Sequence, residues 1–149
     1  TLEKTGDPAT IETAQQTPET GTLRRDQAEI DRLFSGESLN DIATMLRDET
    51  TVFAADTLKK LSRSSPLSMA CAVEMMHRLR GPSLTMQKAL DLEYRFTFRA
   101  MEHGDFLEGI RAAIIDKDRN PKWQHTSMDV PTADTAKMLR PLGQNALKL

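Results

Sequence analysis

The chain has 149 residues, which allows one domain of ordinary size. Its 20 lysines and arginines nearly balance 22 acidic residues, so a net charge of −2 argues against a nucleic-acid or membrane-surface partner. The single cysteine, Cys71, excludes an internal disulfide and is typical of a reducing compartment. No apolar run approaches the roughly 18–20 residues that a membrane span requires.

The N-terminal 22 residues differ in composition from the rest of the chain. Seven of them are threonines, and prolines and glycines are scattered among them. Too few are apolar to offset the entropy cost of ordering this stretch. We therefore predict a Thr/Pro-rich linker or extended segment over residues 1–24, followed by a helical domain over residues 25–149.

The remainder has helical periodicity and no alternating segment typical of a strand, which predicts an all-α chain. Ser38, with Asp41 three residues later, predicts a capped helix start, and Ser65-Pro66 predicts another. Asp105 is expected to cap the helix that follows it. The expected helices lie at about 26–34, from 39 to at least 46, 52–62, 66–80, from 83 or 85 to 103, 105–115 and 132–140.

Few residues suggest chemistry inside this chain. It has no Gly-rich phosphate loop, and its three histidines lack metal-ligand spacing, so we predict no catalytic residue and no metal site. Glu93 lies on a mostly apolar strip, where we expect a salt bridge with Arg95, Arg99 or a partner in another domain, or a contact with substrate. A stripe of Met69, Val73 and Met76 is expected to form core or a contact surface.

Three sequence motifs resemble the crotonase (enoyl-CoA hydratase/isomerase) superfamily, and in particular its 3-hydroxyisobutyryl-CoA hydrolase branch. The most specific is GDFLEGIRAAIIDKDRNPKW at Gly104–Trp123, which resembles the last helix and basic turn of that branch. The stretches TVFAADTLKKLSRSSPLS at Thr51–Ser68 and GPSLTMQKALDLEYRF at Gly81–Phe96 are similar to earlier helices of the family. Together the motifs cover roughly residues 30–123 in the family's order.

The resemblance implies that this chain is the C-terminal helical lid and oligomerisation region of a crotonase-type α/β enzyme. The ββα spiral core, which supplies the oxyanion hole and the acidic catalytic residues in the family, is absent from it. The expected partners are therefore that core, an acyl-CoA substrate and a possible second copy. Coenzyme A is part of the substrate, so no separate cofactor is expected.

The resemblance also implies a role for Lys117, which follows the last helix of the motif. In some crotonases a lysine at that position reaches the nucleotide of coenzyme A. On the residues alone, Lys117, Arg119 and Lys122 are equally consistent with solvated charges at a helix end. Lys117 is therefore our candidate contact for the coenzyme A phosphates.

The parent protein is expected to hydrolyse an acyl-CoA thioester in valine breakdown, in the cytoplasm of a bacterium or alternatively in the mitochondrial matrix. The isolated chain is expected to be inactive. Two alternatives stay open. The parent could hydrate or isomerise an enoyl-CoA, or the chain could be a stand-alone helical interaction module.

Overall fold

The computed structural model describes residues 2–9, 11, 15, 20–82 and 84–148. Its contacts divide the chain into two units, Thr1–Arg32 (unit 1) and Leu33–Leu149 (unit 2). The helices α1 (Leu2–Thr5) and α3 (Thr22–Arg25) belong to unit 1, and α4 (Gln27–Leu33) ends at the first residue of unit 2. The division into a linker over 1–24 and a domain over 25–149 stays a prediction.

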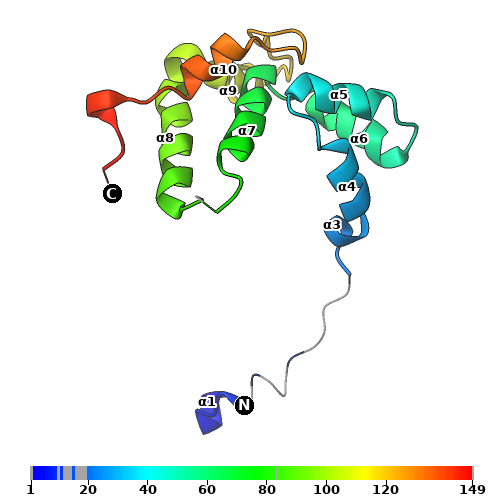
Figure 1. Ribbon diagram of the computed structural model, residues 1–149, viewed down its shortest axis with the longest axis vertical. Coiled ribbons are helices and arrows are strands. Elements are labelled where there is room, and N and C mark those ends of the chain that lie inside the picture. Colours follow the sequence, from blue (N-terminus) through cyan, green and yellow to red (C-terminus); the bar gives the residue numbers. More distant parts are fainter. Residues whose placement is uncertain (1, 10, 12–14, 16–19, 83, 149) are drawn as a thin grey trace. The chain divides into compact units, whose positions relative to one another are not determined.

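Unit 2 consists of helices and the turns between them (Figure 1). They are α5 (Leu39–Arg47), α6 (Val52–Leu61), α7 (Pro66–Arg78), α8 (Met86–His103), α9 (Phe106–Ile110), the π-helix η1 (Arg111–Ile115), α10 (Thr132–Met138) and the 3₁₀ turn η2 (Gly143–Asn145). The described residues contain no strand, so the expectation of an all-α chain is confirmed for them. None of their helices has the length and apolarity to cross a membrane.

Side-chain caps fix where four of these helices begin. The hydroxyls of Ser38, Thr51, Ser65 and Thr85 each accept a hydrogen bond from the backbone N–H three residues later. At α5 the Ser38 N–H in turn donates to the Asp41 carboxylate at 3.0 Å, which completes a capping box of the kind that the sequence predicts. Each such cap typically contributes about 1 kcal/mol to helix stability.

Unit 2 has two small buried clusters. The first joins α5 and α6 through Ile42, Leu46 and Ala54, with Leu33 also buried. The second packs α10 against α7 through Met138, Leu139, Leu67 and Cys71. Burial raises the pKa of the Cys71 thiol to about 12, so this side chain is an inert part of the packing.

Two arginines of α8 attach the C-terminal segment to this second cluster. Arg99 donates to the carbonyls of Met138 and Arg140 at 3.0 and 2.6 Å, and Arg95 donates to that of Leu139 at 3.3 Å. Carbonyls at a helix C-terminus lack partners within the helix. The two guanidiniums therefore satisfy the end of α10 while fixing it beside α8.

The face of α8 opposite Leu92 and Ala100 carries apolar side chains, most of which are exposed. Met86, Leu90, Tyr94 and Phe98 recur every four residues and so share one side of the helix, with Met101 one turn beyond. Phe98 is 47% and Met101 59% exposed, whereas Leu92 and Ala100 on the other side are buried. We call these five residues the α8 stripe.

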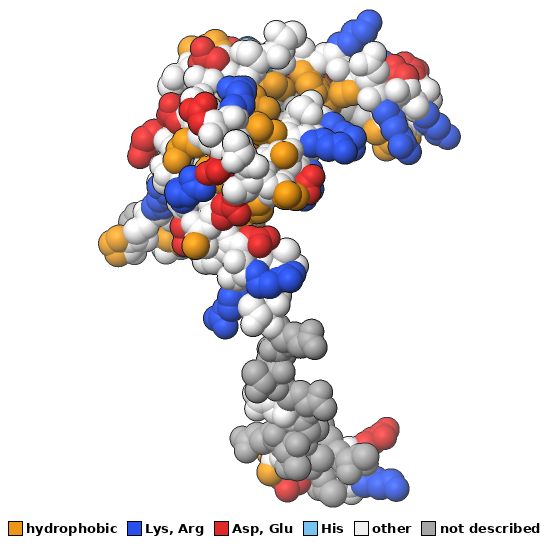
Figure 2. Space-filling model, turned by 90° about the vertical axis from the view of Figure 1, so that its right-hand side faces the viewer, with side chains coloured by type: hydrophobic (Ala, Val, Ile, Leu, Met, Phe, Trp, Pro, Cys, Tyr) orange, Lys and Arg blue, Asp and Glu red, His pale blue; other side chains and the backbone are white. Residues whose placement is uncertain are grey.

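Apolar side chains also reach the surface of unit 2 elsewhere, and Figure 2 shows such groups between charged ones on one face. The predicted Met69/Val73/Met76 stripe divides in the structure. Val73 packs against the first cluster, whereas Met76 is 62% exposed. Exposed apolar patches of this kind commonly mark contact surfaces.

Candidate functional site

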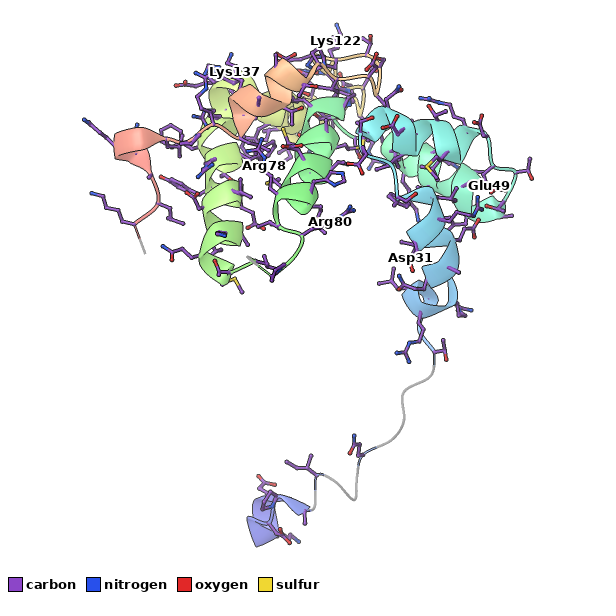
Figure 3. The ribbon with its side chains drawn as sticks, viewed as in Figure 1. Asp31, Glu49, Arg78, Arg80, Lys122 and Lys137 are labelled. Carbon is purple, nitrogen blue, oxygen red and sulfur yellow. The ribbon has the colours of Figure 1, made fainter. Side chains whose placement is uncertain are left out.

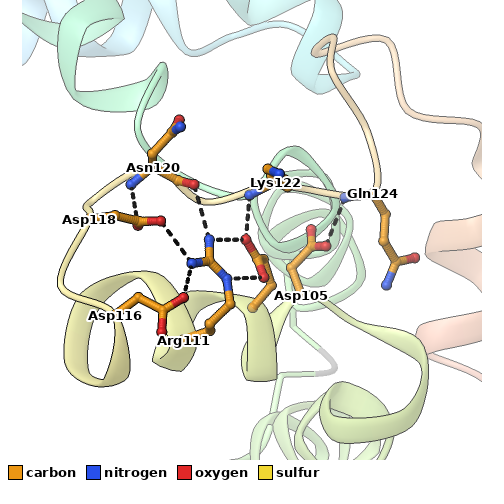
Figure 4. Close-up of polar contacts among 8 residues, drawn as sticks. Asp105, Arg111, Asp116, Asp118, Asn120, Lys122 and Gln124 are labelled. Carbon is orange, nitrogen blue, oxygen red and sulfur yellow. Dashed lines mark hydrogen bonds and ion pairs between the residues drawn. The ribbon is translucent and has the colours of Figure 1, made fainter.

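The segment from α9 to residue 124 is organised around the guanidinium of Arg111 (Figure 4). Its Nε and Nη2 donate to the two oxygens of Glu108 at 2.8 and 2.7 Å. Nη1 donates to Asp116 at 2.6 Å and to Asp118 at 2.8 Å. Nη2 also donates to the carbonyl of Asn120 at 3.1 Å. We call these four partners, with Arg111 itself, the Arg111 cluster.

The cluster lowers the pKa of its carboxyl groups and raises the pKa of its guanidinium. Hydrogen bonds from Arg111, then from the Lys122 N–H, lower the pKa of Glu108 from its ordinary value of 4.5 to about 2. The same guanidinium lowers the pKa of Asp118, and the carboxylates raise the pKa of Arg111 well above its usual range. The carboxylates of Glu108 and Asp118 are therefore ionised at neutral pH.

The backbone around Arg111 departs from the predicted helix. The sequence predicts one α-helix over 105–115, but α9 ends at Ile110 and η1 continues as a π-helix. The Asp116 N–H donates to the carbonyl of Arg111, five residues back, at 2.8 Å. Lys117 and Arg119 then take positive φ angles of 56° and 52°, which reverses the chain. The widened turn brings Asp116 and Asp118 onto the same guanidinium.

The sequence predicts that Asp105 caps α9, but its side chain makes no capping hydrogen bond and instead joins three segments. It is 4% exposed, and its carboxylate accepts from the Ser65 hydroxyl at 2.5 Å. Its other oxygen accepts from the Gln124 N–H at 2.9 Å. This arrangement is favourable because a carboxylate that is removed from water needs hydrogen-bond donors from the protein. Asp105 thus connects the start of α7 to the segment after the turn.

Gly109 and Trp123 add another contact between the same segments. We call the contacts of Asp105, Glu108 and Gly109 with the segment 120–124 the clamp. A Cβ built on Gly109 would lie 3.6 Å from the indole, so the ring packs closely over the glycine. Glu108 accepts from the Lys122 N–H at 2.6 Å, next to the Asp105 contact with Gln124. An apolar cavity of about 290 Å³ lies here, lined by Phe96, Phe106, Ile110, Ile114 and Trp123 among others.

The motif that carries the resemblance is thus largely structural. Asp105, Glu108 and Gly109 each hold part of the segment 120–124. Sequence reasoning missed Arg111 as the centre of this arrangement. The available signal was Glu108 three residues before Arg111, a helical ion-pair spacing, followed by two aspartates.

Lys117, the candidate coenzyme A contact, is exposed at the outer edge of the turn. The acids on either side of it, Asp116 and Asp118, are both paired with Arg111. Among the described residues Lys117 itself has no ion pair, so its ammonium group is available to a ligand. Arg119 and Lys122 are exposed as well.

Glu93 and Arg95 do not form the expected pair. Glu93 is exposed, and within the described part of the chain it has no ion pair with Arg95 or Arg99. Arg95 instead pairs with Asp91, one turn earlier in α8, while Arg99 binds the carbonyls after α10. The helix phase explains the difference, because residues i and i+4 face each other and i and i+2 do not. A contact of Glu93 or Arg95 with substrate stays a prediction.

The described residues include no group of three or more His, Cys, Asp or Glu side chains arranged to hold a metal ion. The histidines lie in separate places. The imidazole Nε2 of His125 is 3.3 Å from Asp134, and the Nδ1 of His77 is 3.9 Å from Glu37.

Residues 3–139 match the family model described as enoyl-CoA hydratase/isomerase. Among curated relatives, the mitochondrial 3-hydroxyisobutyryl-CoA hydrolase of Mus musculus is 36% identical over 120 residues, 80% of this chain and 31% of its own. The protein of that name from Dictyostelium discoideum is 39% identical over 103 residues, 68% of this chain and 26% of its own. The chain thus spans between a quarter and a third of the length of these relatives.

Two solved structures share the fold. An enoyl-CoA hydratase from Rhodobacter sphaeroides superposes with a TM-score of 0.85 at 48% identity, over 95% of this chain and 43% of that one. A carnitinyl-CoA dehydratase from Mycobacterium thermoresistibile gives a TM-score of 0.81 at 24% identity, over 95% of this chain and 40% of its own. The second likeness bears on the fold alone.

Replacing Arg111 by lysine should loosen the segment 116–124 while keeping the positive charge. An ammonium group cannot present the planar fork that meets Glu108, Asp116 and Asp118 together. We expect a thermal midpoint lowered by several degrees and a red-shifted emission from Trp123, the only tryptophan in the chain. Arg80→Lys, at an exposed position outside the cluster, is the matched control. Unchanged emission in Arg111→Lys would contradict the clamp.

The cluster also predicts an acid-dependent loss of stability. Because the folded-state pKa of Glu108 is depressed to about 2, its carboxylate stabilises the folded chain above about pH 4.5. That stabilisation is lost as the pH falls from about 4.5 towards 2. Glu108→Gln should therefore flatten the decline in unfolding free energy measured by urea titration at pH 3–6. Asp118 titrates in the same direction, so part of the slope should remain.

Proposed function

The chain belongs to the enoyl-CoA hydratase/isomerase family, and we propose that it is the C-terminal helical part of an acyl-CoA thioester hydrolase. The preferred activity is that of a 3-hydroxyisobutyryl-CoA hydrolase. The observation that carries this choice is the similarity to enzymes of that name over 80% of the chain. In this assignment the chain supplies structure and substrate contacts, and the catalytic residues lie in another part of the parent enzyme.

The exposed apolar surface of unit 2 supports packing on such a part. The α8 stripe includes Phe98 and Met101, which are both about half exposed. Phe106 and Ile114, at the rim of the apolar cavity, are 54% and 64% exposed. Burying side chains of this size against an apolar surface would stabilise association by about 25 cal/mol for each Å² removed from water. We propose the catalytic core as their partner, with a second copy of the chain as a further contact.

One observation favours the second candidate, an enoyl-CoA hydratase. The Rhodobacter sphaeroides structure of that description has 48% identity with the chain.

The names of the curated relatives bear on the location of the parent enzyme. They are named as mitochondrial proteins, which favours the mitochondrial alternative, and they lend no support to a cytoplasmic location.

The two enzyme activities differ in their products, so one assay separates them. A hydrolase releases free coenzyme A, whose thiol reacts with a disulfide reagent, whereas a hydratase consumes the conjugated double bond and leaves the thioester intact. We expect the parent enzyme to release thiol from 3-hydroxyisobutyryl-CoA. Loss of enoyl absorbance without thiol release would instead assign the hydratase. A sharp, cooperative melt of the isolated chain as a monomer would favour the stand-alone module.

We further propose that Lys117 contacts the phosphates of coenzyme A in the parent enzyme. The ammonium group is exposed, and the neighbouring acids Asp116 and Asp118 are occupied by Arg111. Lysine can meet a phosphate as a point charge without bidentate geometry. The contact is solvent-exposed, so its contribution should be on the order of 1 kcal/mol and should shrink as salt rises.

Lys117→Ala should therefore raise the Michaelis constant for coenzyme A thioesters several-fold with little change in turnover. An acyl-pantetheine substrate, which lacks the nucleotide, should be unaffected by the substitution. Lys59→Ala, at an exposed position on α6, is the control. Equal effects of Lys117→Ala on both substrates would mean that Lys117 acts only through the fold of the turn.

A further inference from the structure

A second cavity of unit 2 lies between the start of α5, the middle of α7 and the residues from 128 to 135, where α10 begins. Its volume is about 210 Å³, several times the roughly 30 Å³ that one water molecule occupies in the liquid. The aliphatic side chains of Leu39 and Val73 line it together with polar ones. A small ligand with an apolar part and a polar group therefore suits it. We call this cavity the 128–135 pocket.

The charged side chains that line the 128–135 pocket are all acidic. They are Glu37, Glu74 and Asp129. No lysine, arginine or histidine of the described residues lines it. Arg78 on α7 and Lys137 on α10, both labelled in Figure 3, lie outside the lining. A ligand in this pocket therefore meets a negative field, which favours a cation and disfavours an anion.

The three acids differ in how far other side chains already neutralise them. One oxygen of Glu74 accepts from the Arg78 Nε at 2.6 Å, and Oε2 of Glu37 is 3.9 Å from Nδ1 of His77. The carboxylate of Asp129, by contrast, has no ion pair and accepts no hydrogen bond within the described ranges. Asp129 therefore keeps an uncompensated negative charge for a ligand.

A buried hydroxyl without a partner opens onto the same pocket. Thr135 on α10 is 7% exposed. Its backbone N–H donates to the carbonyl of Pro131, but among the described residues its hydroxyl forms no hydrogen bond. In that part of the chain only Arg95 Nε is fully enclosed and unpaired, so the Thr135 oxygen reaches the pocket. A polar group removed from water costs free energy unless it is hydrogen-bonded, and a donor in the pocket would supply that bond.

We propose that the 128–135 pocket binds a small organic cation of the primary alkylammonium class, with the ammonium group at Asp129 and Thr135 and the alkyl part against Val73. The three N–H donors of an ammonium group match a carboxylate, a hydroxyl and the side-chain carbonyl of Asn40, which also lines the pocket. A metal ion fits less well, because the described residues hold no group of three His, Cys, Asp or Glu side chains arranged around one point. The proposal does not depend on which reaction the parent enzyme catalyses.

Three four-carbon ligands that differ in charge test this assignment. The 149-residue chain, labelled with nitrogen-15, is titrated with n-butylammonium, 1-butanol and butyrate at constant ionic strength while its backbone amide shifts are followed by NMR. We expect saturable shifts at Asn40, Val73 and Thr135 with butylammonium, weaker binding of butanol and no binding of butyrate. A higher salt concentration should weaken the binding of butylammonium, because it screens the carboxylates.

Asp129→Asn and Thr135→Val should each weaken the binding of butylammonium roughly two- to fivefold. Asp129 is exposed, so its substitution should leave the fold unchanged even if Thr135→Val disturbs α10. Asp56→Asn is the matched control, because Asp56 is exposed on α6 and the substitution makes the same change of charge outside the pocket. Absence of saturable shifts with butylammonium would overturn the proposal. So would butanol or butyrate binding as tightly as butylammonium, or equal losses in Asp129→Asn and Asp56→Asn.

Discussion

The ion pairing of Arg111 is the interaction on which the surface of this chain from residue 105 to residue 124 depends. One guanidinium joins Glu108 on the preceding helix to Asp116 and Asp118 on the turn and to the carbonyl of Asn120. Charge-assisted hydrogen bonds in bidentate geometry are among the strongest that proteins form. They offset the cost of a π-helix and of two non-glycine residues with positive φ, which would otherwise disfavour this turn. The position of Trp123, which lines the apolar cavity, follows from that turn.

A second constraint is the small size of the interior. Unit 2 buries two separate clusters, and much of the remaining apolar surface stays open along α8, α9 and η1. Helices gain most of their stability from the packing of an apolar face rather than from intrinsic propensity. A helix such as α8, apolar on two opposite sides, is suited to lie between two layers. In the proposed enzyme, one side of α8 would pack on α10 and the other on the catalytic core.

The motif residues and the proposed ligand contacts play different parts. Asp105, Glu108, Gly109 and Arg111 bind other parts of the same chain, and their polar groups are occupied. Lys117 is an exposed cation at the edge of that framework. A framework whose own polar groups are occupied and which carries an unpaired lysine at its edge can meet a phosphate-bearing ligand without rearranging. Preorganisation of this kind lowers the entropy cost of binding.

The sequence by itself determined most of the helices and the family, whereas the π-helix after Ile110 appears only in the structure. Capping signals at Ser38 and Ser65 and the apolar spacing of α5 to α8 are local, so propensity and periodicity suffice to predict them. The three motifs, taken together in their order along the chain, were enough to predict the family, which the family model over residues 3–139 confirms. The local ion pairs of Arg95 with Asp91 and of Arg111 with Glu108 follow from helix phase, a rule that the sequence already contains. Only the tertiary structure decided the partners of Asp105. Whether Asp105 caps α9 or binds Ser65, 40 residues away, depends on which donors burial brings to it. The contact between Ser65 and Asp105 joins positions distant in sequence, and no local pattern encodes it.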